Sequence, residues 1–517
     1  MGRIKLTIWV RYRATAAHQL SIGPRELVSL RHHRLFALSS SLYRYDLRIC
    51  ARLRCIGRVL HAGHGAYRVC ARPVGPLPAE RDGDQHLEFV LNGSGAPGVY
   101  NSSQFADYGG YNWCNMPHVR ATEYIIAPAE YKLAYVEVIQ RHHKRTPYAS
   151  NTFFKEDVEW QCEDEGVIRY VKSHSGPGAD PAVIQWNAYM SDQNPWATSV
   201  GPGFVGSNCQ LPQITAEGLQ DSYQHGADIR SVYAPLLGWD ETLDPETVTI
   251  RVTNNDITSQ VAGGLLRGLF PGVEDVQVLV QPEGVDSLEP SYACPAADDI
   301  RAAYTTGSAN WMDHLDAAAG LYAKLDAVSG TEAEDDGGWH VSFDHYYDNL
   351  SAKQCHQKTL PCSVNDTALC VTQEEADTVY RLGNWEYSYL YRDATNSTLY
   401  SALKFGAWVL ELKAHLEEVA EGKSTTKYYH NVAHDGSISL LLGFLQISKM
   451  VWPGMGSEIV FELYENSDQY YLRVLFGGQT LETSTSLGVL NMIPVKDFIA
   501  YIESTLGAGS ELYASCQ

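Results

Sequence analysis

One short basic segment has the side chains best suited to hold an anion: Gln140-Arg141-His142-His143-Lys144-Arg145-Thr146-Pro147. Two guanidinium groups flank the imidazole of His142, and arginine binds phosphate oxygens through a planar fork that stays charged at any working pH. The segment directly follows an apolar stretch, 132–139, that has the pattern of a buried strand. We therefore expect it at the edge where an open α/β sheet binds its ligands. The alternative is a basic surface turn with two solvated histidines.

A second candidate lies far along the chain, at His434-Asp435-Gly436. It falls between an expected strand, 427–433, and an expected helix that begins near Ser437. The N-terminus of a helix offers free N–H groups and the positive end of the helix dipole, which favour a bound anion. The pair also has a plainer interpretation, in which Asp435 is a helix N-cap and His434 packs in the core.

The elements that must position these two segments have α/β character. Besides the strands already named, the sequence predicts strands at 247–253, 458–464 and 470–476, the last two as a hairpin. It predicts helices at 215–233, 259–270 and 437–446, and residues 298–330 and 373–420 have helical composition. We expect a mixed, mostly parallel central sheet flanked by helices, with α-rich insertions roughly at 150–245 and 290–420.

With both segments in the expected order, the sequence resembles the histidine acid phosphatases, the branch that includes phytases and prostatic-type acid phosphatase. The resemblance rests on Arg141-His142-x-x-Arg145-x-Pro147 together with the distant His434-Asp435. Secondary matches are Leu211–Gln220, which is similar to the family's L-T-x-x-G-x-x-Q helix start, Arg251-Val-Thr253 and Glu458–Tyr464. The similarity covers roughly residues 128–505.

The resemblance implies a phosphomonoesterase with an acidic pH optimum that acts on small-molecule phosphate esters and needs no metal or other cofactor. It implies that His142 is the nucleophile and forms a phosphohistidine, and that Asp435 protonates the leaving group. The phosphate-binding side chains that it implies are Arg141, Arg145 and His434, with Arg251 as a further candidate.

Two positions depart from the family pattern. The glycine that follows the family's nucleophile is replaced by His143, and a later phosphate-binding arginine falls on Ile257. Loss of one cation could cost a few kcal/mol in transition-state binding, and Arg251, Lys144 and His143 are candidates to replace it. A weakly active or non-catalytic phosphate-ligand binder on the same fold therefore stays open. A third class, an unrelated secreted carbohydrate-binding protein, rests on the 32 Tyr and 11 Trp, although aromatic side chains usually serve the core.

Charge divides the 517-residue chain into two unlike parts. Residues 1–75 hold thirteen Arg, one Lys and two acids, which give this part a net charge of +12. Since the whole chain has a net charge of −22, the remaining residues carry −34. The acidic body makes nucleic acid an unsuitable partner. The Arg-rich extension is compatible with an anion-binding arm, a targeting segment, or an artefact in place of the true N-terminus, and we expect no fold from it. We expect residues 76–127 to be an extended lead-in and 128–517 the histidine phosphatase-like domain.

The cysteines favour an oxidising compartment. Eight of the eleven lie in the body at scattered spacings and none forms a CxxC pair, which suits structural disulfides rather than a zinc ribbon. Five N-x-S/T sequons occur, at Asn92, Asn101, Asn349, Asn365 and Asn396. No apolar stretch approaches the roughly twenty residues of a membrane span. We therefore expect a secreted, extracellular or vacuolar/lysosomal glycoprotein.

Overall fold

The structure is a computed structural model in which part of the chain is described. The described residues are 87–96, 110–153, 155–162, 168–171, 182–186, 188–191, 193–274, 276–332 and 338–517. All of them belong to one compact unit, Val74–Gln517. The Arg-rich extension and the sequon at Asn101 lie outside the described residues.

A seven-stranded sheet lies at the centre, in the order β4-β5-β1-β6-β7-β8 with β9 beside β7. The strands are β1 (Lys132–Arg141), β4 (Val248–Val252), β5 (Tyr428–Ala433), β6 (Glu458–Asn466), β7 (Gln469–Phe476), β8 (Gln479–Thr480) and β9 (Ile493–Pro494).

The sheet is mixed, as expected, but parallel pairing does not predominate. Among its described strands, only β4, β5 and β1 pair in parallel, whereas the pairs from β1 to β6 and onward are antiparallel. The difference arises at β6, which begins beside the carboxyl end of β1, with Glu458 opposite Gln140, and therefore runs antiparallel to β1. The β6–β7 pair is the hairpin that the sequence predicts, and Ser467 and Asp468 connect its strands with φ values of 51° and 62°. Two successive residues of positive φ are typical of the tight turn that joins antiparallel strands.

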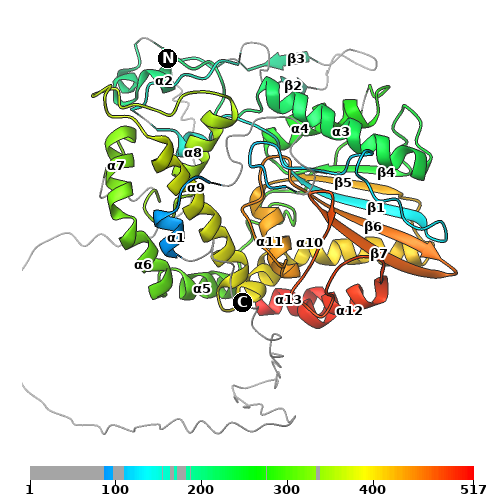
Figure 1. Ribbon diagram of the computed structural model, residues 1–517. Coiled ribbons are helices and arrows are strands. Elements are labelled where there is room, and N and C mark those ends of the chain that lie inside the picture. Colours follow the sequence, from blue (N-terminus) through cyan, green and yellow to red (C-terminus); the bar gives the residue numbers. More distant parts are fainter. Residues whose placement is uncertain are drawn as a thin grey trace, which may run out of the picture. The chain divides into compact units, whose positions relative to one another are not determined.

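Helices cover both faces of the sheet (Figure 1). Helices α3 (Ala216–Leu237) and α4 (Asp256–Leu269) cover one face, and α10 (Ser397–Ala420), α11 (Asp435–Leu445) and α12 (Val495–Leu506) cover the other. Along β1, Val136 and Val138 pack into the first core, and Tyr135 and Ile139 into the second. Because both faces of β1 are buried, the strand reads as an almost continuous apolar run.

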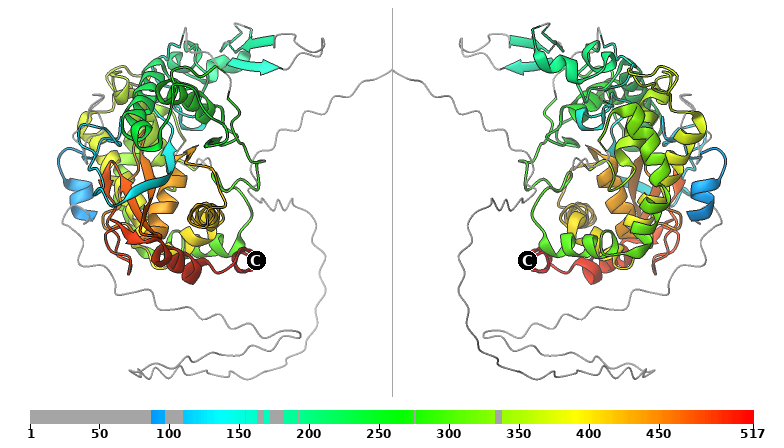
Figure 2. Two further views of the ribbon diagram at one scale, coloured as in Figure 1. Left: turned by 90° about the vertical axis from the view of Figure 1, so that its right-hand side faces the viewer. Right: turned by 90° about the vertical axis from the view of Figure 1, so that its left-hand side faces the viewer.

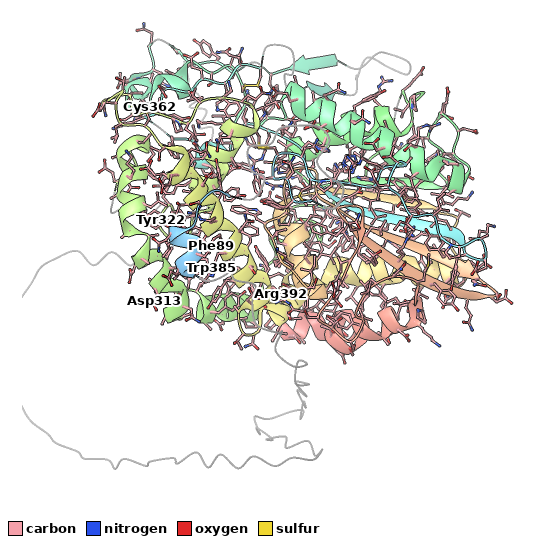
Figure 3. All side chains as sticks on the ribbon, viewed as in Figure 1. Phe89, Asp313, Tyr322, Cys362, Trp385 and Arg392 are labelled. Atoms are coloured by element: carbon pink, nitrogen blue, oxygen red, sulfur yellow. A yellow bond between two sulfur atoms is a disulfide. The ribbon has the colours of Figure 1, made fainter. Side chains whose placement is uncertain are left out.

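A group of helices lies beside the sheet, next to the carboxyl ends of β1 and β5 (Figure 1). It comprises α5 (Pro295–Tyr304), α6 (Ala309–Ala317), α7 (Ala319–Ser329), α8 (Asp344–Cys355) and α9 (Gln373–Ser388). Its core is rich in aromatic side chains, among them Tyr322 and Trp385, which are labelled in Figure 3. A π-helical turn, Tyr389–Asp393, follows α9, and α13 (Gly509–Ser515) comes near the chain end.

The segment before α3 is less helical than expected. Between β1 and α3 the described residues form only short elements: the 3₁₀ turns Ala149–Asn151 and Pro195–Ser199, helix α2 (Pro202–Val205), and strands β2 (Ile168–Val171) and β3 (Ala182–Gln185). The two strands pair with each other in a small separate sheet that projects outward at the top of the view (Figure 2). Frequent Gly and Pro break helices in this stretch, and the long helix α3 belongs to the sheet core rather than to an insertion. Conversely, the expected extended lead-in contains a short helix, α1 (Leu87–Asn92).

All eight cysteines of the body form disulfides: Cys114–Cys355, Cys162–Cys209, Cys294–Cys516 and Cys362–Cys370. One of the five sequons is not an acceptor in the folded chain. Asn349 is fully buried in α8, and its side chain bonds to the Asn151 carbonyl and to Lys353. None of the described helices is both long and apolar enough to cross a bilayer.

Candidate active site

The parallel pairing of β1 with β5 brings the two predicted segments together. Arg141 at the end of β1 lies opposite Ala433 at the end of β5, and the N–H of His142 donates to the Ala433 carbonyl over 3.0 Å. The rings of His142 and His434 lie 5.5 Å apart between centroids. A single phosphoryl group is large enough to contact both imidazoles.

The imidazole of His142 is held in one tautomer. Its Nδ1 lies 2.9 Å from the His143 carbonyl oxygen. Because a carbonyl only accepts, Nδ1 carries the proton and Nε2 has an available lone pair. Burial, reinforced by the charges of Arg145 and Arg141, lowers the pKa of His142 well below its usual value. The ring is therefore neutral, as a nitrogen nucleophile must be.

Arg141 is fixed from three sides and is almost fully buried. It donates to the Pro453 carbonyl, lies 3.1 Å from a carboxylate oxygen of Asp435, and stacks 4.5 Å above the Trp113 ring. Contacts of this kind hold a guanidinium in one orientation before any ligand arrives.

Arg145 is fixed by the helical group. Its two terminal nitrogens lie 3.1 and 3.2 Å from the two carboxylate oxygens of Asp348 on α8, and its guanidinium lies 4.4 Å above the Tyr148 ring. Asp348 was not expected from the sequence, because an acid inside a helix far along the chain forms no motif with the basic segment. The pair shows that α8 helps to build the site.

Asp435 is the first residue of α11, and its carboxylate has three partners. It accepts from the N–H of Gly436 over 2.9 Å and from the Trp452 indole over 2.8 Å, besides the contact with Arg141. Burial alone would raise the pKa of Asp435, but Arg141 and the indole outweigh it and lower that pKa below its usual value. Before substrate binds, the expected proton donor is therefore ionised rather than protonated.

His434 is the N-cap residue of α11. Its Nε2 lies 2.9 Å from the Thr253 hydroxyl and 3.3 Å from a carboxylate oxygen of Glu289. Thr253 closes the expected Arg251-Val-Thr253 strand end, whereas Glu289 was missed, since its loop has no recognisable pattern. His434 thus meets a carboxylate at the nitrogen that could bind a phosphate oxygen.

Two of the candidates to replace the missing arginine point elsewhere. The fully buried His143 contacts His225 over 3.2 Å, and His225 contacts Glu458 over 2.8 Å. Lys144 forms a buried ion pair of 2.9 Å with Asp221. Burial lowers the pKa of His143 well below its usual value, so its ring is neutral, and the charge of Lys144 is used within the core.

The third candidate, Arg251, also bonds to carboxylates. Its terminal nitrogens lie 2.7 Å from Asp286 and 2.6 Å from Glu411. Ile257 is fully buried in the apolar core beneath α4. In the described part of the chain, neither Arg251 nor Ile257 therefore adds a free positive charge beside Arg141 and Arg145.

The chain is similar to several known proteins. Counting factor 60 of Dictyostelium discoideum is 25% identical over 390 residues, which are 72% of this chain and 86% of that protein. Lysophosphatidic acid phosphatase type 6 of Bos taurus is 23% identical over 364 residues, 67% of this chain and 78% of the relative. Among solved structures, the phytase from Citrobacter braakii matches with a TM-score of 0.47 and 12% identity, over 74% of this chain and 99% of the phytase.

The family model for the histidine phosphatase superfamily (branch 2) matches residues 132–477. The match runs from β1, through both predicted segments, to the end of the β6–β7 hairpin. The chain therefore belongs to branch 2 of the histidine phosphatase superfamily.

Proposed function

We propose that the protein hydrolyses organic phosphate monoesters through a phosphohistidine on His142. The observation that carries the proposal is the state of that ring: Nδ1 donates to the His143 carbonyl, so Nε2 has a lone pair, and two arginines flank it. An activated nitrogen nucleophile beside cations that can take up phosphoryl charge fits covalent phosphoryl transfer.

In the first step His142 Nε2 attacks phosphorus and the bond from phosphorus to the ester oxygen breaks. Asp435, which takes up the proton of the bound ester monoanion, gives that proton to the departing oxygen, which leaves as an alcohol. In the second step water attacks the phosphohistidine, Asp435 takes a proton from that water, and phosphate leaves with His142 restored. Arg141, Arg145 and His434 stabilise the phosphoryl oxygens in both steps.

A slow phosphatase, or a phosphate-ligand binder without turnover, is the second candidate. It is favoured by the pairing of each expected phosphate-binding side chain with a carboxylate: Arg141 with Asp435, Arg145 with Asp348, and His434 with Glu289. A phosphate dianion has to compete with these carboxylates, and Ile257 adds no cation. We propose an active but slow enzyme.

Trapping the intermediate tests the proposal. The chain is mixed briefly with a ³²P-labelled aryl phosphate at acidic pH, quenched in alkali and digested. We expect label on the peptide that contains His142, stable in alkali and lost in acid, as a phosphoramidate requires. The variant His142→Ala should carry no label, and its kcat should be lower than that of the wild type by about 10³-fold or more.

His340→Ala is the matched control, because His340 is a partly exposed histidine that pairs with Asp326 in the helical group. It should keep both the label and the turnover. Equal turnover in wild type and His142→Ala would contradict catalysis. Saturable phosphate binding without turnover or label would establish the binder instead.

The disulfides and the four sequons outside α8 support a further proposal, that the chain passes through the secretory pathway and carries glycans. Asn365 and Asn396 are both exposed. A shift in mass on treatment of the native protein with an N-glycosidase is the expected result.

A further inference from the structure

We propose that Glu289 selects the substrate's leaving group, disfavouring esters that carry a second negative charge beside the phosphate and favouring those that are neutral or carry an ammonium group. The inference rests on the proposed phosphatase function and deepens it, since it concerns the substrate class of the same site. Its starting point is the contact of 3.3 Å between the Glu289 carboxylate and His434 Nε2.

Glu289 reaches the site and also reaches solvent. Its side chain is 44% exposed, whereas His434 and the two arginines are nearly buried. A phosphate oxygen that binds His434 Nε2 would displace the Thr253 hydroxyl and the Glu289 carboxylate from that nitrogen but leave the carboxylate next to the phosphoryl group. The leaving group would then meet a negative charge on the open side of the pocket.

The loop that presents Glu289 is firmly held. Arg251 bonds to Asp286 over 2.7 Å and to the Ser287 hydroxyl over 2.9 Å. The Ser437 hydroxyl of α11 donates to the Leu288 carbonyl over 2.6 Å, which ties the loop to the helix that begins with Asp435. The three residues that directly precede Glu289 are thus tied to Arg251 and to α11, and this anchoring holds the backbone that presents Glu289.

The other charges of the site leave the Glu289 carboxylate without a cation that would offset its effect on the substrate. The charges of Arg141 and Arg145 are already balanced by Asp435 and Asp348, and Glu289 lies against His434. With the apolar Ile257 at the third arginine position, the described part of the pocket has no surplus cation to offset a second anionic group on the substrate. Such a group near Glu289 would be repelled, and an ammonium group there would be attracted.

Three esters of matched size isolate the effect: phosphoethanolamine, ethylene glycol monophosphate and phosphoglycolate, whose leaving groups end in an ammonium, a hydroxyl and a carboxylate. In the wild type we expect kcat/KM to fall in that order. In Glu289→Gln, whose amide oxygen can still accept from His434, we expect the ratio of the first ester to the third to drop by about tenfold.

Glu283→Gln is the matched control, since Glu283 is an exposed acid of the same loop and loses the same charge. It should leave the ratio as in the wild type. If the wild type is active and Glu289→Gln leaves the ratio of the two kcat/KM values unchanged, the proposed selection by Glu289 is wrong. The same holds if Glu283→Gln changes this ratio as much as Glu289→Gln does. Loss of all three activities in Glu289→Gln alone would also overturn it, because Glu289 would then serve the reaction itself. A wild type inactive on all three esters and on aryl phosphate would refute the proposed function, a result distinct from the others.

Discussion

In the proposed mechanism, Asp435 is ionised beside Arg141 in the free protein and yet has to give a proton to the leaving group. The substrate resolves this conflict. The second pKa of a phosphate monoester is about 6, so below that pH the ester arrives as a monoanion and carries the proton with it. Inside the pocket the proton can pass to Asp435, because the dianion neutralises Arg141, which had kept the carboxylate ionised.

This origin of the proton predicts the pH profile. His142, with its lowered pKa, stays neutral at pH values well below the usual range of histidine, so the nucleophile is available in acid. Above about pH 6 the ester loses its proton and kcat/KM should fall. We expect an acidic optimum, with a fall of kcat/KM at higher pH whose midpoint follows the second pKa of the ester. Profiles of kcat/KM against pH for esters of different acidity measure this dependence.

Asp435→Asn supplies the control, since its amide keeps the size of the side chain and can still accept from Trp452. Turnover of an alkyl phosphate should fall far more than turnover of a nitrophenyl phosphate, whose leaving group needs no proton. If kcat/KM falls at the same high pH for all esters, the fall reports the titration of a protein group rather than of the substrate. That result would contradict the mechanism.

Ile257 occupies the position of the family's third arginine, but restoring arginine there is not expected to restore a phosphate contact. The side chain is fully buried among Val261, Leu265 and the other apolar residues of its core. For Ile257→Arg we expect the free energy of unfolding to fall by about 3 kcal/mol, since a guanidinium without a partner would be placed in that core. Urea denaturation measures the loss.

Ile257→Met, which conserves volume, should cost less than about 1.5 kcal/mol. A gain in kcat/KM of tenfold or more for Ile257→Arg, with stability retained, would show that the position faces the phosphate after all.

At the scale of secondary-structure elements, the loop before β6 determines where His142 lies. Gly456 has a φ of 73°, its N–H donates to the His142 carbonyl over 3.0 Å, and a Cβ there would lie 2.4 Å from the His143 ring. In Gly456→Ala the His143 ring must shift, and the shift passes to His142. Because small displacements of reacting groups are costly, we expect kcat to fall more than about tenfold.

Gly422 offers a matched control, as it has a φ of 67° but nothing within 4 Å of the place that a Cβ would take. Gly422→Ala should cost only about 1 kcal/mol of backbone strain and leave kcat unchanged. Equal effects of the two variants on kcat would mean that Gly456 acts through backbone strain alone rather than through His143.

The strands and helices that hold the site were predictable from sequence because their signals are local. The apolar run of β1, the alternation in β4 and the Thr215 cap of α3 each correspond to an element of the structure. Pairings across the chain were not predictable. Asp348 meets Arg145, and Glu289 meets His434, only because helices and a loop distant in sequence fold over the sheet edge.

The same limit explains the error in the sheet. The five longer strands and the late hairpin have local patterns, but the pairing of β1 with β6 does not: β6 begins beside the carboxyl end of β1 and runs antiparallel to it. The two-residue strands β8 and β9 are too short to show a pattern. The ionisation state of Asp435 was likewise not predictable from the sequence, because its pKa depends on Arg141 and Trp452, which only the fold brings next to it.

Across the whole molecule, the phosphate pocket depends on contacts between the sheet core and the helical group. Trp113, which stacks on Arg141, is the neighbour of Cys114, and Asp348, which holds Arg145, lies on α8, which ends at Cys355. The disulfide between these two cysteines thus joins the supports of both arginines. It should matter to activity as well as to stability.

Two disulfides of nearly equal span separate these contributions. Cys114–Cys355 and Cys294–Cys516 have sequence separations of 241 and 222 residues, so chain entropy predicts a similar loss for either, about 5 kcal/mol on conversion of both cysteines to serine. We expect comparable decreases in Tm for the two double variants. At a temperature where both stay folded, only Cys114→Ser/Cys355→Ser should raise KM and lower kcat, because only it loosens Trp113 and α8 around the arginines. Equal kinetics in the two variants would mean that packing alone positions the pocket.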